Sequence, residues 1–137
     1  MVMGCIFCKI VSGDIPAKIL SETVHSISFL DAFPLAKGHV LVIPKHHRQK
    51  IQDMGKEENA DLFSLVHTML SKVDFMTGAT LMAAHNGKDA GQEVPHVHVH
   101  LVPRSIDDSA GAIHSMFDSD LTLSESELNE LCDALKI

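Results

Sequence analysis

Apolar residues along the chain recur at two different spacings, and the change between them separates helices from strands. Over residues 56–76 they recur at intervals of three and four, which predicts a long helix with one core-facing stripe. Residues 124–135 repeat that spacing behind a Ser-x-x-Glu capping box and predict a C-terminal helix. We also expect a short helix within residues 4–12 that stops near Gly13.

Short segments outside these helices have the composition of β-strands. Ser26–Asp31 alternates apolar and polar side chains, and His39–Ile43 is a β-branched run closed by Pro44. The predicted strands are 19–21, 26–31, 39–43, 80–85 and 97–102. Because strands and helices show no βαβ alternation, their order predicts an α+β fold. We expect an antiparallel sheet of about five strands, one long central helix and a C-terminal helix.

The composition limits the classes of function. With 137 residues, 45% hydrophobic and 21% charged, the chain is expected to form a single domain over 1–137. A net charge of −7 disfavours binding to nucleic acid. We find no apolar run long enough to span a membrane and no signal peptide, so we expect a cytoplasmic protein, with the nucleus as the other option. Since Trp and Tyr are absent, a nucleobase pocket must be lined by Phe and aliphatic side chains.

Residues 96–100, His-Val-His-Val-His, carry the most distinctive chemistry of the sequence. Side chains alternate between the two faces of a strand, so the imidazoles share one face and the valines the other. Folding does not require histidines there, because Thr, Val or Ile suit a strand better. Three explanations fit this run: a solvated histidine-rich face, a catalytic metal held by the histidines, or a set of reactive imidazoles.

The loop 86–95, which precedes the histidines, has the composition of a ligand-binding loop. Gly87 and Gly91 allow its backbone to approach a ligand closely, and Asn86 and Gln92 offer neutral amide donors. This loop favours a functional explanation of the histidines over a solvated face.

Cys5 and Cys8 form a Cys-x-x-Cys pair, which is typical of redox or zinc chemistry. A redox pair is expected in a thioredoxin-like βαβ context, which this sequence lacks. Zinc needs two further ligands, and the histidines at 46–47 and His96 are candidates. Two unliganded thiols are the remaining alternative. Cys132 stands alone in the C-terminal helical pattern and is expected to be buried and inert.

Together these residues resemble the histidine-triad superfamily, whose signature is His-φ-His-φ-His-φ-φ with φ hydrophobic. Further pieces occur in the order and at about the spacing of that family: Cys5–Ile10 (CIFCKI), Ile15–Ala17, Phe29–Asp31, Gly38–Pro44 (GHVLVIP), His47, Asn86-Gly87 and Gly91–Arg104 (GQEVPHVHVHLVPR). The resemblance covers residues 4–104, and residues 105–137 are a variable tail that holds the C-terminal helix. The nucleotide-binding branch, in its zinc-containing form with a Cys-x-x-Cys, is the most similar.

The resemblance implies an enzyme that attacks the α-phosphorus of a nucleotide derivative with His98 and then hydrolyses a covalent nucleotidyl-histidine. By position, His100 contacts phosphate oxygens, His39 supports the triad, and Asn86 and Gln92 touch phosphate or leaving group. The implied activity is hydrolysis of purine nucleoside phosphoramidates, as by an adenosine monophosphoramidase. Four alternatives stay open: a dinucleoside polyphosphate hydrolase, a nucleotidyl transferase, a nucleotide-binding adaptor with incidental turnover, and a zinc-dependent hydrolase.

The resemblance also implies a structural zinc site and no organic cofactor. Its ligands would be Cys5, Cys8, His47 and His96, with His46 as the fallback. This site would leave His98 free to react.

The same family pattern implies a pocket for a purine nucleotide such as an AMP derivative. Its apolar walls would be Ile6, Phe7, Ile10, Phe29 and Leu41. Asp31 would accept hydrogen bonds from the ribose hydroxyls. A homodimer built through the long helix and the following strand is implied as well. Glu93 departs from the branches that carry Ser or Thr there, and we expect it to favour amine leaving groups.

Overall fold

The structure, a computed structural model, describes residues 2–137. The chain divides into two compact units, Met1–Asp107 and Asp108–Ile137. In chain order its elements are α1 (Ile6–Ser12), β1 (Ile19–Glu22), β2 (Ser26–Leu30), β3 (Val40–Pro44), the 3₁₀ turn Ile51–Asp53, α2 (Lys56–Thr77), β4 (Thr80–Ala83), the 3₁₀ turn Lys88–Ala90, β5 (Val99–Pro103), the 3₁₀ turn Ile113–Met116 and α3 (Glu125–Leu135).

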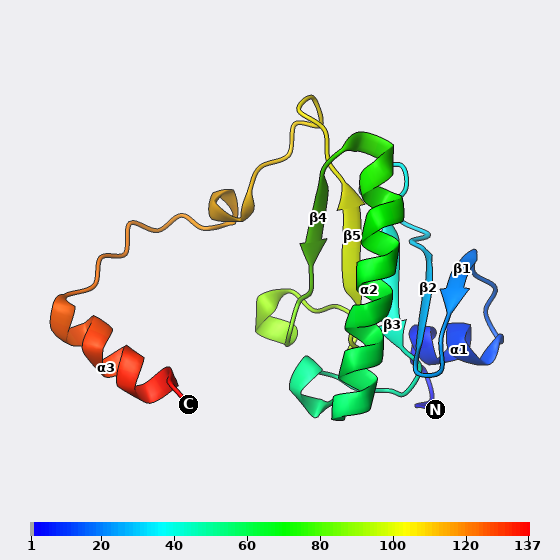
Figure 1. Ribbon diagram of the computed structural model, residues 1–137, viewed down its shortest axis with the longest axis horizontal. Coiled ribbons are helices and arrows are strands. Elements are labelled where there is room, and N and C mark those ends of the chain that lie inside the picture. Colours follow the sequence, from blue (N-terminus) through cyan, green and yellow to red (C-terminus); the bar gives the residue numbers. More distant parts are fainter. Residues whose placement is uncertain (1) are drawn as a thin grey trace. The chain divides into compact units, whose positions relative to one another are not determined.

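The strands of the first unit form one antiparallel sheet in the order β1-β2-β3-β5-β4 (Figure 1). With the long helix α2 and the C-terminal helix α3, this sheet confirms the predicted α+β fold. β5 begins at Val99, later than the predicted residue 97. The reason is that the N–H groups of His96 and Val97 donate to carbonyls outside the ladder, at 2.8 and 2.7 Å. Residues 96–98 of the histidine run therefore precede β5.

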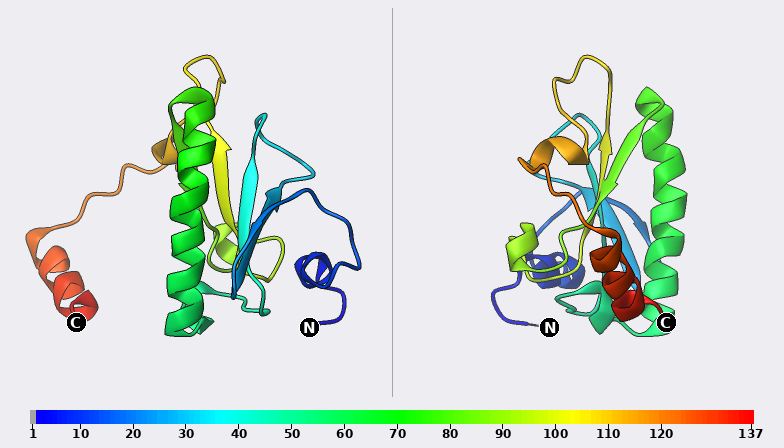
Figure 2. Two further views of the ribbon diagram at one scale, coloured as in Figure 1. Left: turned by 45° about the vertical axis from the view of Figure 1, so that its right-hand side comes forward. Right: turned by 90° about the vertical axis from the view of Figure 1, so that its left-hand side faces the viewer.

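Side-chain alternation gives the sheet two faces, each with its own core. Figure 2 shows α2 along one face and α1 on the opposite side. Val42 and Leu101, both without exposed surface, pack in the core that includes Leu62 of α2. Leu41 belongs to the second core, together with Phe7 of α1. The two helices thus hold the sheet between them.

The strand register assigns the histidines to the face of α1. Leu41 of β3 pairs with His100, and Ala83 of β4 pairs with His100 from the other side. Directly opposed residues in an antiparallel ladder project from the same face. Because Leu41 lies in the core beneath α1, His100 shares that face, and α2 supports the sheet from behind.

Helix α2 has the stripe that the spacing of apolar residues predicts. Its buried residues are Leu62, Leu65, Val66, Met69 and Val73. The helix ends at Gly78, whose φ of 84° is left-handed and whose N–H donates to the carbonyl of Asp74. None of the described helices is both long and apolar enough to cross a membrane.

The unit Asp108–Ile137 contains α3, which begins at the predicted capping box. The N–H of Glu127 donates to Ser124 Oγ at 3.2 Å, and the Ser124 N–H donates to the Glu127 carboxylate at 2.8 Å. The expectation that Cys132 is buried is wrong, because no residue of α3 is buried and its thiol is exposed. A single domain over 1–137 stays a prediction.

Candidate active site

The three imidazoles of the histidine run lie together under α1. His96 and His98 are buried, and His100 is half-buried. The rings of His98 and His100 meet edge-on with centroids 5.0 Å apart. Phe7 of α1 packs edge-on against His98, also with centroids 5.0 Å apart. This burial rules out a solvated histidine-rich face.

One hydrogen bond fixes the tautomer of His98. Its Nδ1 lies 2.7 Å from the backbone oxygen of His96. A carbonyl oxygen only accepts, so in the neutral ring Nδ1 carries the proton and Nε2 keeps its lone pair. Burial lowers the pKa of His98 below the ordinary value of 6.5, which keeps the ring neutral at neutral pH. A neutral imidazole with a free Nε2 lone pair is a competent nucleophile.

A chain of hydrogen bonds fixes the tautomers of His39 and His100 in the same way. The backbone N–H of Leu35 donates to Nδ1 of His39 at 3.0 Å, so the proton of the neutral His39 ring is on Nε2. That Nε2–H donates to Nδ1 of His100 at 3.0 Å. His100 then carries its own proton on Nε2, where it acts as a hydrogen-bond donor.

Burial also keeps these two rings neutral. It lowers the pKa of His39, and it lowers the pKa of His100 to about 4 with the help of charge on the neighbouring histidines. Asp31, His39 and His100 have potential metal ligands within 4.8 Å of one another. The Nδ1 lone pairs of both histidines are already occupied by N–H donors, however. The geometry therefore favours a hydrogen-bond relay over a catalytic metal centre.

Asn86 and Gln92 hold the loop between β4 and β5 in place. The Asn86 amide accepts from the Ile51 N–H and donates to Gln52 Oε1, both at 2.9 Å. The Gln92 amide accepts from the Gly87 N–H at 2.9 Å and donates to a backbone carbonyl at 2.8 Å. Each amide nitrogen keeps one further N–H. Their contacts with phosphate stay a prediction.

His85 joins the site, although sequence reasoning placed it only at the end of a strand. It is half-buried, and its ring meets His100 edge-on with centroids 5.7 Å apart. The feature that could have identified His85 is its position two residues after Ala83, which pairs with His100. Side chains two apart on a strand share a face, so the register, once known, brings His85 to the triad.

Cys5, Cys8, His47 and His96 bring one potential metal ligand each within 4.8 Å of the others. The Sγ atoms of Cys5 and Cys8 lie 3.5 and 3.7 Å from Nδ1 of His96, and Cys8 Sγ lies 3.5 Å from Nδ1 of His47. Zinc bound at about 2.3 Å to sulfur and about 2.05 Å to nitrogen, with tetrahedral angles, sets S···N separations of about 3.6 Å. The donor set fits, so this group could hold a metal ion.

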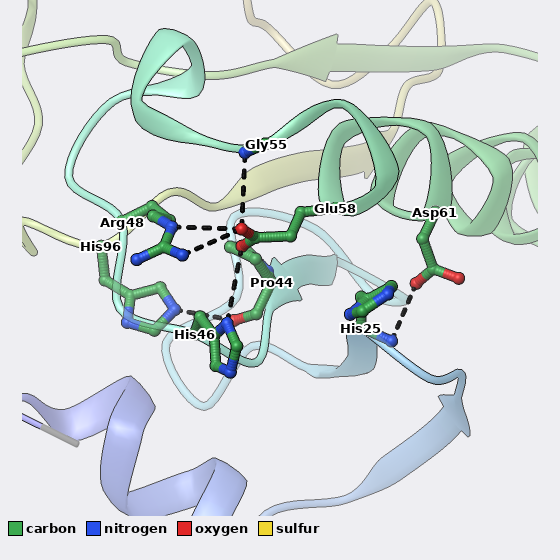
Figure 3. Close-up of polar contacts among 8 residues, drawn as sticks. All are labelled: His25, Pro44, His46, Arg48, Gly55, Glu58, Asp61 and His96. Carbon is green, nitrogen blue, oxygen red and sulfur yellow. Dashed lines mark hydrogen bonds and ion pairs between the residues drawn. The ribbon is translucent and has the colours of Figure 1, made fainter.

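A backbone carbonyl orients His96 for such a role. Nε2 of His96 donates to the carbonyl of Pro44 at 2.8 Å, which leaves the Nδ1 lone pair toward the cysteines (Figure 3). His46, the fallback ligand, is instead 69% exposed, with Nδ1 3.9 Å from Glu58 Oε2. Glu58 also accepts from Arg48 at 2.9 Å, and that hydrogen bond is the main cause of its lowered pKa. His46 thus belongs to a separate network.

A cavity of about 550 Å³ opens beside α1, a volume typical of small-molecule sites. The residues expected to form the nucleoside pocket all line it: Ile6, Phe7, Ile10, Phe29, Asp31 and Leu41. Oδ1 of Asp31 accepts from the Phe33 N–H at 2.9 Å, so this carboxylate also starts the turn that follows. Phe7 lines the cavity and touches His98, and the cavity and His98 therefore adjoin.

Known proteins share this sequence pattern. The profile of the HIT domain matches residues 12–106. The adenosine 5′-monophosphoramidase of Schizosaccharomyces pombe is 45% identical over 102 residues, which span 74% of this chain and 75% of that protein.

Solved structures share the fold. A histidine triad nucleotide-binding protein from Candida albicans superposes with a TM-score of 0.83 at 32% identity, covering 96% of this chain and 94% of that chain. A Zn-bound histidine triad family protein from Mycobacterium smegmatis superposes with a TM-score of 0.68 at 37% identity, covering 78% of this chain and 79% of that chain. The chain therefore belongs to the HIT domain family, as its resemblance to the histidine-triad proteins predicted.

Proposed function

We propose that the protein is a hydrolase that cleaves purine nucleoside phosphoramidates, as an adenosine monophosphoramidase does, through a covalent nucleotidyl intermediate on His98. The observation that carries the proposal is the neutral His98, whose free Nε2 lone pair adjoins a cavity of nucleoside size. The name of the Schizosaccharomyces pombe relative supports an AMP derivative as the substrate.

The reaction consists of two displacements at the α-phosphorus. In the first, the Nε2 lone pair of His98 forms a bond to phosphorus and the amine departs. In the second, water attacks and the electron pair of the P–N bond returns to His98. The hydrogen bond from Nδ1–H to the His96 carbonyl stabilises the positive charge on the ring while it holds the nucleotide. The Nε2–H of His100 donates to a phosphoryl oxygen as negative charge builds there.

The cavity beside α1 is the binding site for the nucleoside. The base lies between apolar side chains such as Ile6 and Phe29, and the carboxylate of Asp31 accepts from the ribose hydroxyls. Only one oxygen of Asp31 is engaged by the turn that follows it, which leaves Oδ2, 3.5 Å from His39 Nε2, as the second acceptor.

A zinc ion held by Cys5, Cys8, His47 and His96 has a structural role. When bound, the ion would link α1 to the histidine run, and with four protein ligands it would serve to hold the fold and not to bind substrate. The agreement of the S···N separations with tetrahedral zinc supports this assignment. His98, two residues after His96, then reacts from an anchored backbone.

Glu93 biases the site toward amine leaving groups. Glu93 is exposed, and together with Lys88 it lines a hollow of about 550 Å³. Its charge raises the pKa of His98, although burial lowers that pKa by more. A carboxylate attracts an amine or ammonium group and repels a phosphate. Glu93→Ser is therefore expected to lower the ratio of phosphoramidate to phosphate-ester turnover. An unchanged ratio would contradict this role.

A homodimer through β4 and α2 is part of the proposal. β4 lies at an edge of the sheet. Phe75 is 92% exposed and Met76 53%, and Leu81 and Met82 of β4 are 40% and 49% exposed. Apolar surface over an open strand edge is rarely left uncovered in a monomer. Light scattering is expected to give a dimer for the wild type and a monomer for Leu81→Lys, whereas a monomeric wild type would contradict the proposal.

A substrate panel tests the activity. An AMP alkylphosphoramidate is expected to give a higher kcat/KM than a diadenosine polyphosphate. The reverse order would favour a polyphosphate hydrolase, and tight binding of both without turnover would favour an adaptor. Activity that survives in His98→Ala and is lost on chelation would favour a zinc-dependent hydrolase.

A further inference from the structure

The strand register brings His85 to the reacting histidine. β4 and β5 are antiparallel, with Ala83 opposite His100. β4 ends at Ala83 and β5 begins at Val99, so His85 and His98 each lie just beyond the ladder, where an extension of the same side-chain alternation would set them on one face. The edge-on contact of the His85 and His100 rings, with centroids 5.7 Å apart, agrees with this placement. His85 therefore lies on the face from which His98 attacks.

Packing positions the ring of His85, while its two nitrogens make no hydrogen bond, among the residues described, that would stabilise the fold. Gly91, with a φ of +103°, brings the loop against the ring: a Cβ there would lie 3.2 Å from Cδ2 and 3.4 Å from Nε2 of His85. The ring nitrogens make no hydrogen bond with any of residues 2–137. A half-buried imidazole without partners is available to a bound ligand.

An amine that leaves phosphorus must be protonated as it departs, because an amide anion is a poor leaving group. The groups already assigned cannot supply that proton. His98 must keep Nε2 unprotonated, and the pKa of His100, lowered to about 4 mainly by burial, leaves it neutral. The side chains of Asn86 and Gln92 are amides, which donate hydrogen bonds but do not give up a proton.

We propose that His85 is the catalytic acid and base for the leaving group, an assignment that rests on the proposed phosphoramidase function. In the first step, the His85 imidazolium gives its proton to the leaving nitrogen as the substrate P–N bond breaks and the bond from phosphorus to His98 Nε2 forms. The amine leaves neutral, and His85 becomes neutral. In the second step, His85 takes a proton from the attacking water as the new P–O bond forms. The electron pair of the P–Nε2 bond returns to His98, and both rings regain their starting states.

Two substrates that differ only in leaving group test this role. One is AMP linked to an alkylamine, and the other is AMP linked to p-nitrophenol, which departs as a stable anion without a proton. His85→Gln keeps a hydrogen-bonding amide but cannot transfer a proton. We expect it to lower kcat/KM for the alkylamine substrate by about 100-fold or more, the usual extent of general acid catalysis. The value for the ester should stay within about threefold of the wild type.

A matched variant and a rescue complete the test. His67→Gln removes an exposed histidine of α2 and is expected to leave both rates unchanged. In His85→Ala, added imidazole should raise kcat/KM for the alkylamine substrate and leave kcat/KM for the ester unchanged, because kcat/KM reports the steps up to transfer of the nucleotide to His98 and not the later attack by water. If His85→Gln lost kcat/KM equally on both substrates, or lost it on neither, the assignment to His85 would be overturned. A wild-type protein that turns over neither substrate would overturn the proposed function itself.

Discussion

Leu35, His96 and Pro44 each contribute a backbone atom to the site. The N–H of Leu35 fixes the proton of His39, the carbonyl of His96 fixes that of His98, and the carbonyl of Pro44 fixes that of His96. Each bond decides which ring nitrogen is left to react or to bind. These roles could not be predicted from side-chain identity, because the fold and not the residue type places a backbone group.

The half-buried His100 is expected to make the fold less stable in acid. Its pKa is about 4 in the folded protein and 6.5 for an ordinary imidazole, chiefly because of burial. As the pH falls from 6.5 toward about 4, the unfolded chain binds a proton that the folded chain does not. The free energy of unfolding therefore falls through that window, by on the order of 2 to 3 kcal/mol for this group.

Urea unfolding measures this effect. Between about pH 7 and about pH 4.5, the wild type should lose more stability than His100→Gln, which lacks the titrating ring. Release of zinc in acid affects both proteins alike and cancels in the comparison. An equal loss in the two proteins would contradict the lowered pKa of His100.

At the scale of secondary structure, periodicity predicted interiors better than ends. The apolar run that forms β3 and the stripe of α2 follow from their own side chains. The end of β4 at Ala83 and the start of β5 at Val99 depend on partners elsewhere in the chain. His85 was missed for the same reason, since only the pairing of β4 with β5 shows that it faces the triad.

The loop between β4 and β5 contains two glycines with positive φ that can be compared. Gly91 (φ 103°, ψ 9°) is left-handed, so an alanine there costs about 1–2 kcal/mol of backbone strain, whereas Gly87 (φ 115°, ψ 157°) lies in a region open essentially to glycine alone, so alanine is more strained there. At Gly91 the new Cβ would press on the His85 ring, whereas at Gly87 it would meet only the flexible end of Lys50. Gly91→Ala is therefore expected to lower kcat/KM for a phosphoramidate more than Gly87→Ala, even though Gly87→Ala is expected to lose more Tm. Equal kcat/KM values would show that the contact with His85 is unimportant.

At the scale of the molecule, the cluster of Cys5, Cys8, His47 and His96 links α1, near the start of the chain, to His96, which lies near the end of the first unit. Cys5 and Cys8 are separated from His96 by 91 and 88 positions. The Cys-x-x-Cys pair and the histidines could be selected from the sequence, because few residue types bind zinc. Their convergence depends on the sheet, which carries His47 and His96 to the same side as α1.

Removal of the metal is expected to weaken the fold and leave the chemistry intact. Chelation should lower the Tm of the zinc-loaded wild type by on the order of 5–10 °C, because a structural ion binds only the folded chain. Cys8→Ser should be insensitive to chelation. Scanning calorimetry, with turnover measured well below Tm, makes the comparison. Loss of turnover in a chelated protein that remains folded would contradict a structural role.

Covalent catalysis requires that His98 carry the nucleotide during turnover. The protein is mixed with an AMP phosphoramidate, quenched in alkali, in which phosphohistidine survives, and mapped by mass spectrometry. Covalent catalysis predicts an adduct of AMP mass on His98 that acid removes, and no such adduct in His98→Ala. Steady turnover without an adduct, or an adduct that persists in His98→Ala, would contradict it.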